Sequence, residues 1–193
     1  MPRTVDPALV ARRRAAILEA AAAEFSSAGF ERARAADIAA RAGVSSGTVF
    51  YYFTDKAGLF RALFGADVER NTALCDRALA EPDPRAAIAI VIDALAESAV
   101  DPIAPGIVAE LIRRVPADPA LAEIVATADG LVRSALAAII TRGQADGAFD
   151  PGLDPAHAAA FLVSLTDGAH LADGDVRPDV RRAALAYLRP EET

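Results

Sequence analysis

Hydroxyl groups are concentrated in one short stretch of this 193-residue chain, between residues 45 and 52, and a lysine follows at position 56. Hydroxyls donate and accept hydrogen bonds, an ammonium group pairs with anions, and glycine lets the backbone approach a ligand closely. This combination suits contacts with the phosphates and base edges of a nucleic acid. The candidate contact residues are Ser45, Ser46, Gly47, Thr48, Phe50, Tyr51, Tyr52 and Lys56.

Four consecutive aromatic residues at 50–53 can belong to a core or to a binding surface. Because successive residues of a helix point in different directions, the four cannot all face inward. We expect Phe53 to be buried and Tyr51 and Tyr52 to face DNA. For Phe50 the pattern favours neither position over the other.

Residues 36–52 have the spacing of two helices joined by a tight turn. Ala39 is small enough for the helices to cross closely, Gly43 suits the turn, and Val49 would fill the angle between them. Ser45 is a favoured N-cap for the second helix. In a helix-turn-helix of this kind, the second helix enters the major groove of DNA.

Asp-Pro pairs mark helix starts along the chain, because aspartate caps the free N–H groups of a first turn and proline fits the first helical position. Four pairs precede Ala- and Leu-rich stretches, at Asp6, Asp83, Asp118 and Asp154. No strand-like alternation appears. The predicted helices are 7–28, 36–42, 46–52, 56–80, 83–100, 105–115, 118–145, 154–172 and 178–188.

The composition is that of a globular protein, with 53% hydrophobic and 24% charged residues. Charged residues or prolines interrupt every apolar run before about 18 residues, and the N-terminus lacks a secretory pattern. We therefore expect a cytoplasmic protein with no membrane contact. Residues 1–56 carry a net charge of +2 and residues 57–193 a net charge of −9, which is compatible with a DNA-reading head on an acidic body.

Motifs for catalysis or metal binding are missing from the sequence. Cys75 is the only cysteine, and the two histidines, His157 and His170, are thirteen residues apart. No Gly-rich phosphate loop, His-x-x-x-His or Gly-x-Ser-x-Gly sequence is present. We expect no enzyme, no metal and no cofactor. A helical protein-interaction module that no longer binds DNA stays as the alternative, and an enzyme is a remote one.

Residues 21–64 resemble the DNA-binding domain of the TetR (tetracycline-repressor) family. The resemblance rests on Phe-x-x-x-Gly-Phe, then Asp-Ile-Ala-x-x-Ala-Gly-Val-Ser, then Gly-Thr-x-x-Tyr-x-Phe-x-x-Lys-x-x-Leu. So many fixed spacings over about forty residues are far more specific than one short motif. Two departures stand out. The family's Thr-Thr-Val-Arg-like stretch is replaced by residues 33–36, where Arg34 is expected to supply the phosphate contact, and Phe50 stands where the family usually has tyrosine.

The resemblance implies an all-α fold of about nine helices. A three-helix helix-turn-helix head, residues 1–55, would stand on an effector-binding and dimerisation body, residues 56–193. It also implies a homodimer in which the helices at 154–172 and 178–188 pair with their copies. The predicted interface residues, some of which must instead belong to the intrachain core, are His157, Phe161, Leu165, Gly168, Val180, Ala184 and Tyr187.

A small-molecule effector bound inside the body is a further implication of the resemblance. The abundance of Ala, Leu and Ile favours an apolar effector. For each polar lining candidate, a purely structural role is the stronger alternative. The predicted effector-binding residues are Phe60, Phe64, Ile107, Glu110, Leu111, Arg114, Thr127, Leu131, Leu165 and His170.

The function implied by the resemblance is repression of transcription. The dimer would bind a palindromic operator on double-stranded DNA, with two recognition helices about 34–36 Å apart. Effector binding would favour a dimer in which the heads have the wrong spacing, so the operator would be released.

Overall fold

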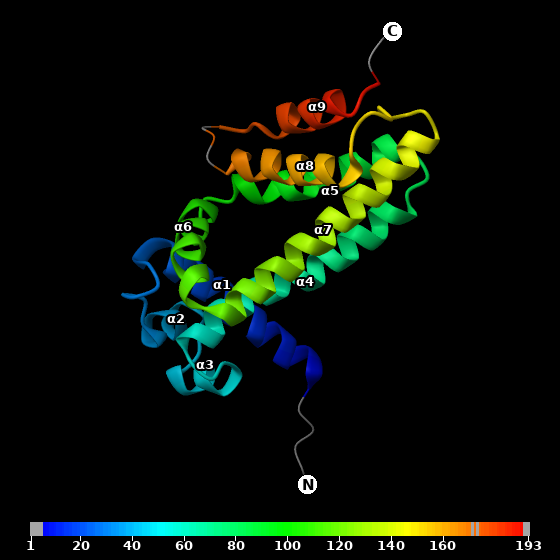
Figure 1. The fold of residues 1–193 in the computed structure, drawn as a ribbon. Helices are drawn as coiled ribbons and strands as arrows, with labels where there is room; N and C mark the ends of the chain where they lie inside the picture. The colour runs from blue at the N-terminus through cyan, green and yellow to red at the C-terminus, as the bar shows by residue number, and fades with distance from the viewer. Residues whose placement is uncertain (1–5, 171, 173, 191–193) are drawn as a thin grey trace. The chain divides into compact units, whose positions relative to one another are not determined.

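A computed structural model describes residues 6–190 apart from residues 171 and 173. Within these residues it contains nine α-helices, two short 3₁₀ helices and no strand (Figure 1). The elements are α1 (Pro7–Ala28), α2 (Ala35–Arg41), α3 (Ser46–Tyr52), α4 (Lys56–Ala80), α5 (Pro84–Glu97), η1 (Ser98–Val100), α6 (Ala104–Arg114), η2 (Val115–Ala117), α7 (Pro119–Ala145), α8 (Pro155–Ala169) and α9 (Arg177–Tyr187). The predicted all-α fold is confirmed, although the predicted helix 154–172 ends earlier, and Leu171 lies outside the described residues.

Aspartate carboxylates cap the starts of four helices, as the Asp-Pro pairs predict. At α1, the backbone N–H of Ala8 donates to Asp6 Oδ1 over 2.9 Å. The same contact is made to Asp83, Asp118 and Asp154 at the starts of α5, α7 and α8, over 2.8 to 3.1 Å. Each cap satisfies an N–H group that has no partner inside its helix, which is worth about 1 kcal/mol per helix.

The chain folds into two compact units. The first takes the chain up to Ala66 together with Pro105–Ala122, and the second takes Asp67–Ala104 and the chain from Glu123 onward. The division therefore falls within α4, and α6 belongs to the same unit as the helix-turn-helix. The first compact unit thus extends beyond the predicted boundary after residue 55.

The second unit has a continuous apolar core formed by α5, α7, α8 and α9 and the end of α4. Its largest fully buried side chains are Phe149, in the loop after α7, and residues of α5, α7 and α8, which include Ile88, Ile92, Leu136, Ile139, Ile140 and Leu162. Cys75 is also buried in this core, where desolvation raises the pKa of its thiol. A buried thiol with a raised pKa is a poor nucleophile, so Cys75 serves as a small apolar residue of this core.

Helix α7 is long and apolar enough to cross a membrane by length and composition alone. In the fold, however, its residues Leu136, Ile139 and Ile140 are fully buried in the core of the second unit. One face of α7 therefore packs inside a globular domain.

The first unit is built around four stacked and edge-on phenylalanine rings. The ring of Phe60 lies 5.2 Å from Phe25, 5.5 Å from Phe30 and 5.2 Å from Phe64, measured between centroids. These contacts join α1, the segment after it and α4. Helix α6 approaches α1 closely, because a Cβ atom at Gly106 would lie only 2.6 Å from the backbone oxygen of Ser26. Glycine is therefore required where these two helices meet.

An ion pair between the partly exposed Arg61 and the buried Asp118 ties α4 to the start of α7. The Arg61 Nε donates to both Asp118 carboxylate oxygens, over 2.9 and 3.0 Å, and Asp118 is 5% exposed. Desolvation acts to raise the pKa of Asp118, but the hydrogen bonds from Arg61 and from the Leu121 N–H outweigh it, so this pKa lies below its usual range. The folded protein is consequently more stable with Asp118 ionised than with Asp118 protonated.

We expect Asp118→Asn to lower the free energy of unfolding by about 1–3 kcal/mol at pH 7, because the Arg61 guanidinium loses its negatively charged partner and keeps only a hydrogen bond to a neutral amide. A carboxyl group with a lowered folded-state pKa stabilises the fold above its unfolded pKa of about 3.9, and this contribution is lost as the pH falls through the folded pKa. The difference between variant and wild type should therefore shrink below about pH 4. Denaturant unfolding at pH 7, 5 and 3.5 measures it. The exposed α4 carboxylate of Asp76 provides the control Asp76→Asn, and equal losses for both variants would contradict the assignment.

Candidate nucleic-acid interface

The turn between α2 and α3 has the hydrogen bonds that are typical where a helix ends at a glycine in the left-handed conformation. Gly43 has a φ of +66°, the left-handed conformation that glycine adopts most readily. The Val44 N–H donates to Ala39 O over 2.9 Å, and the Gly43 N–H donates to Ala40 O over 3.2 Å. This pair of bonds ends α2 and sends the chain into α3, as the helix-turn-helix interpretation requires.

The inner faces of α2 and α3 are buried against the rest of the first unit. Ile38 and Ala39 of α2 are at most 3% exposed, and Val49 is the buried residue of α3 at 1%. Phe53, directly after α3, is 6% exposed, as predicted, and the guanidinium of Arg14 lies 5.5 Å from its ring centroid. These contacts fix which face of α3 is left for a partner.

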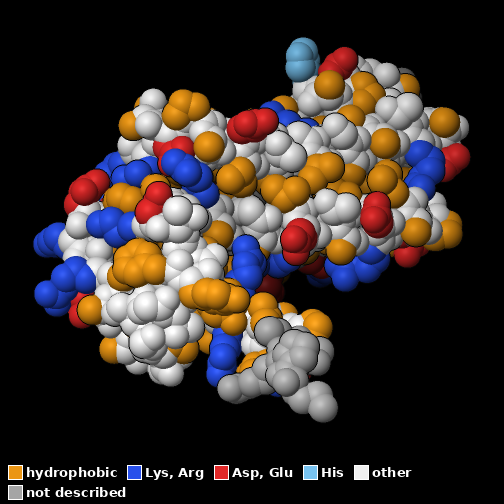
Figure 2. All heavy atoms as spheres, turned by 90° about the horizontal axis from the view of Figure 1, so that it is seen from below, with side chains coloured by type: hydrophobic (Ala, Val, Ile, Leu, Met, Phe, Trp, Pro, Cys, Tyr) orange, Lys and Arg blue, Asp and Glu red, His pale blue; other side chains and the backbone are white. Residues whose placement is uncertain are grey.

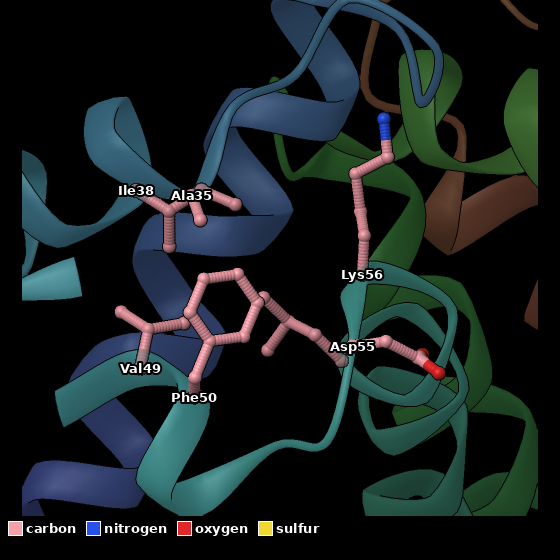
Figure 3. A pocket seen from close by; sticks show the side chains of 7 residues that line it. Ala35, Ile38, Val49, Phe50, Asp55 and Lys56 are labelled. Carbon is pink, nitrogen blue, oxygen red and sulfur yellow. The ribbon is translucent and has the colours of Figure 1, made fainter. Parts of the chain in front are cut away.

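The outer face of α3 presents aromatic side chains to solvent. Tyr51 is 79% exposed, and its ring meets the half-buried ring of Tyr52 edge-on, with centroids 5.3 Å apart. Phe50 is 52% exposed and lies over a shallow apolar hollow beside Ile38 and Leu59 (Figure 3). Phe50 therefore belongs partly to the packing of the head and partly to its surface. Gly47, in the first turn of α3, is exposed and places no side chain between the helix backbone and a partner.

Two of the predicted hydroxyl contacts are used inside the head. The Ser45 side chain accepts a hydrogen bond from the Thr48 N–H over 3.1 Å, which is the N-cap of α3. The Ser45 and Thr48 hydroxyls also lie 2.9 Å apart and bond to each other. Both hydroxyls keep further acceptor capacity, but their first task is to hold the start of α3. Ser46, which is half-buried, completes the predicted hydroxyl set.

The predicted cations, Arg34 and Lys56, have different surroundings. The side chain of Arg34 is 76% exposed and pairs with Asp37 over 2.7 Å. The half-buried Lys56 is already engaged by the backbone, since its ammonium donates to Glu31 O over 3.0 Å and to Ala33 O over 3.3 Å. Figure 2 shows blue Lys and Arg side chains beside orange apolar ones over the part of the molecule that carries α2 and α3. Arg34 is thus the more available of the two for a phosphate.

A cation that the sequence analysis did not single out also lies beside the helix-turn-helix. Arg41, in the last turn of α2, is 52% exposed and pairs with Glu24 of α1 over 3.6 Å. Its place near the end of the predicted helix 36–42, the first helix of the helix-turn-helix, was the available signal. Exposed arginines on both ends of α2 add positive charge beside α3.

The predicted effector residues are divided between the two compact units. Phe60, Phe64, Ile107, Glu110, Leu111 and Arg114 belong to the first, and Thr127, Leu131, Leu165 and His170 belong to the second. Several have structural partners. Phe60 and Phe64 lie in the phenylalanine cluster, the Arg114 guanidinium lies over the Phe30 ring, and Glu110 pairs with Arg113. In the second unit, the exposed Thr127 donates to Glu123 O, and His170 Nε2 lies 3.1 Å from the Ser98 hydroxyl.

The predicted dimer residues divide into a buried and an outward group. Val180 and Ala184 of α9 are 6% and 0% exposed and belong to the core of the second unit, which is the intrachain alternative that the prediction left for some of these residues. They face inward because α9 packs on α5, where Arg181 pairs with Asp93 over 2.9 Å. The outward group consists of the exposed residues His157, Phe161, Gly168 and Tyr187 and the half-buried Leu165.

Comparison with known protein families matches two parts of the chain. Residues 17–63 match the family described as bacterial regulatory proteins of the tetR family. Residues 84–189 match the family described as BetI-type transcriptional repressor, C-terminal. An HTH-type transcriptional repressor of Mycobacterium tuberculosis is 38% identical over 77 residues, which cover 40% of this chain and 41% of that repressor's length.

Solved structures show the same fold along nearly the whole chain. A TetR transcription regulator from Haloarcula marismortui has a TM-score of 0.78 at 24% identity, covering 92% of this chain and 97% of its own. The fatty acid degradation regulator FadR from Bacillus halodurans has a TM-score of 0.78 at 19% identity, covering 98% and 100%. Together with the two family matches and the geometry of α2 and α3, these findings place the chain in the TetR family of bacterial transcriptional regulators.

Proposed function

We propose that this protein is a transcriptional repressor that inserts α3 into the major groove of its operator. The observation that carries the proposal is the exposed aromatic face of α3. Tyr51 is 79% exposed on a helix whose opposite face is closed by Val49, and folding of the head gives no reason for an aromatic side chain there. A tyrosine at this position can donate its hydroxyl to a phosphate or stack against the sugar-phosphate backbone.

The DNA-contacting set that we propose lies around the outer face of α3 and the start of α2. Tyr51, Tyr52 and Arg34 supply phosphate contacts, while Ser46 and Thr48 reach base edges or phosphates. Gly47 allows close approach of the backbone, and Ser45 fixes the first turn of α3. Phe50 adds apolar contact beside Tyr51. Because one recognition helix reads few base pairs, the active species is a homodimer on a palindromic site, with half-sites about one helical turn apart.

Release by a small, largely apolar effector completes the proposal. Phe60 and Phe64 are packed in the aromatic cluster of the first unit and are therefore less suited to line an effector pocket. Half-buried apolar residues are better suited, because part of their surface is still open to a ligand. Leu131 and Leu165 in the second unit are half-buried and are the better candidates. A ligand that prefers one arrangement of the dimer shifts the population toward it and changes operator affinity by the same free energy.

Selection of DNA from a random pool tests the proposal. The full-length protein should enrich sequences with two inverted half-sites, and its affinity for the enriched duplex should fall steeply as salt rises, because phosphate contacts release counterions. A scrambled duplex of the same length and composition is the control. If no sequence is enriched at low salt and both duplexes bind equally weakly, the head does not read DNA and a protein-interaction role becomes the better account.

Removing only the phenolic hydroxyls tests the contact set. We expect the double variant Tyr51→Phe, Tyr52→Phe to weaken operator binding on the order of 10³-fold, because each lost hydrogen bond is worth about 1 kcal/mol, a dimer loses four, and about 1.4 kcal/mol corresponds to tenfold. Fluorescence anisotropy with the enriched duplex measures the affinity. The unfolding midpoint should stay within about a degree of wild type, since neither hydroxyl is needed for packing. Unchanged affinity would remove both tyrosines from the contact set.

A further inference from the structure

One buried aromatic ring is held by cations from two helices. Phe30 lies two residues after the end of α1 and is 6% exposed. The Nζ of Lys56, the first residue of α4, lies 4.6 Å from its ring centroid. The Cζ of Arg114, the last residue of α6, lies 3.4 Å from the same centroid. Both distances are within the range of cation–π attraction, which is strongest where water is excluded.

The same two cations also reach the segment that follows Phe30. The Lys56 ammonium donates to the backbone oxygens of Glu31 and Ala33 over 3.0 and 3.3 Å. The Arg114 Nη1 donates to Glu31 Oε1 over 3.5 Å. Figure 3 shows the Lys56 side chain extending away from Phe50 and from the surface formed by α3. An ammonium group that donates to two carbonyls has one N–H left for any phosphate.

The segment held in this way leads into a helix that lacks the usual cap. Arg34 is the N-cap of α2, and its side chain makes no capping hydrogen bond. The first bonds of α2 run from the Asp37 and Ile38 N–H groups to the Arg34 backbone oxygen, over 3.0 and 3.1 Å. A short helix without a side-chain cap gains its orientation from the chain that precedes it. Fixing residues 29–34 therefore fixes where α2 begins.

We propose that Lys56 and Arg114 are positioning residues that clamp residues 29–34 and thereby set the orientation of α2 and α3 for DNA. In this assignment Lys56 acts through the Phe30 segment instead of through a phosphate, and Arg114 acts on DNA affinity instead of on effector binding. The inference rests on the proposed DNA-binding function. It replaces the separate roles that the sequence predicts for these two residues with a shared one.

Salt dependence separates positioning from direct contact for Lys56. Lys56→Met keeps the aliphatic stem and removes the charge. It should weaken operator binding on the order of tenfold, since lost charge-assisted hydrogen bonds correspond to about one decade. The slope of log affinity against log salt should stay unchanged, whereas loss of a phosphate contact lowers it by about 0.9 per contact, hence about 1.8 per dimer. Arg34→Met, at an exposed cation, should lower the slope and serves as the comparison.

Hydrogen exchange provides a measurement that does not depend on DNA. The Ala33 N–H donates to Gly29 O over 3.0 Å, and the Asp37 N–H donates to Arg34 O. Both amides should exchange at least about tenfold faster in the free Lys56→Met protein than in wild type, because the clamp that limits local opening is gone. Lys56→Arg keeps a cation over Phe30 and should restore protection of both amides in part.

Arg114 is tested with the protein free of any added ligand. Arg114→Met should weaken operator binding several-fold and accelerate exchange of the same Ala33 and Asp37 amides, whereas Arg114→Lys should recover part of both. An effector contact would leave the affinity of the ligand-free protein unchanged. Arg70→Met, on the exposed part of α4, is the charge-matched control and should leave both readouts as in wild type.

Two results would overturn the clamp. One is a salt slope that falls by about 1.8 in Lys56→Met with unchanged amide exchange, which would make Lys56 a phosphate contact. The other is wild-type affinity and exchange in Arg114→Met. Failure of the proposed function looks different, because then wild type itself shows no specific binding while the exchange of Ala33 and Asp37 still responds to Lys56→Met.

Discussion

Val49→Asp should unfold the helix-turn-helix while leaving most of the protein folded. Val49 is 1% exposed and is the only buried residue of α3. A carboxylate at this position would be desolvated beside Ile38 without a cationic partner, which costs several kcal/mol, on the order of the whole stability of a small unit. The second unit has its own core, so its helices should persist. Specific DNA binding should be lost by more than about 100-fold, since no ordered recognition helix is left.

Amide exchange and circular dichroism of the full chain measure this effect. The amides of α2 and α3 should lose protection, whereas those of α5 and α8 should keep it. Ala40→Asp adds the same charge at an exposed position of α2 and should leave the head folded. Protection of α3 equal to wild type in Val49→Asp would show that this valine does not hold the two helices together.

Features that depend on neighbouring residues were predictable from the sequence. Asp6 and its three counterparts cap helices because a carboxylate and the N–H groups it binds lie within three residues of each other. Gly43 ends α2 through bonds that span five residues or fewer. The helix-turn-helix is itself local, so its spacing is visible in residues 36–52. For this reason the two helices of the motif and its inner face agree with the structure.

Features that depend on distant residues were not predictable in the same way. Lys56 follows an aromatic run that suggests a DNA surface, yet its ammonium bonds to backbone oxygens 23 and 25 residues earlier in the chain. Val180 and Ala184 have the spacing of a helix face, but only the packing of α9 on α5 shows that this face points inward. Periodicity shows that a helix has an apolar face. It does not show whether the same chain or a second one covers that face.

An exposed aromatic pair on α8 and α9 is a candidate for a face that a second chain covers. The rings of Phe161 and Tyr187 lie 4.4 Å apart between centroids, and the two residues are 47% and 36% exposed although they lie above a complete core. Gly168, two turns along α8 from Phe161, is exposed and has open space around it. A glycine on an exposed helix face lets another helix approach closely, and paired aromatic rings are common anchors of interfaces. We therefore propose that this face, with His157 and Leu165, pairs with its copy.

Phe161→Glu should convert the proposed dimer to a monomer, because two symmetry-related carboxylates would face each other where two rings had been buried. Operator affinity should fall by about 10²–10⁴-fold, since each head would then bind its half-site alone. Light scattering across a concentration series gives the mass, and anisotropy gives the affinity.

Leu79→Glu is the control, because it introduces the same charge at a residue of α4 that is 41% exposed, on another surface of the second unit. It should preserve both the dimer and the operator affinity. If Phe161→Glu stays dimeric and folded at micromolar concentration, the dimer does not form through this face. A monomeric but folded variant that still binds the palindrome with wild-type affinity would instead show that a single head reads the operator.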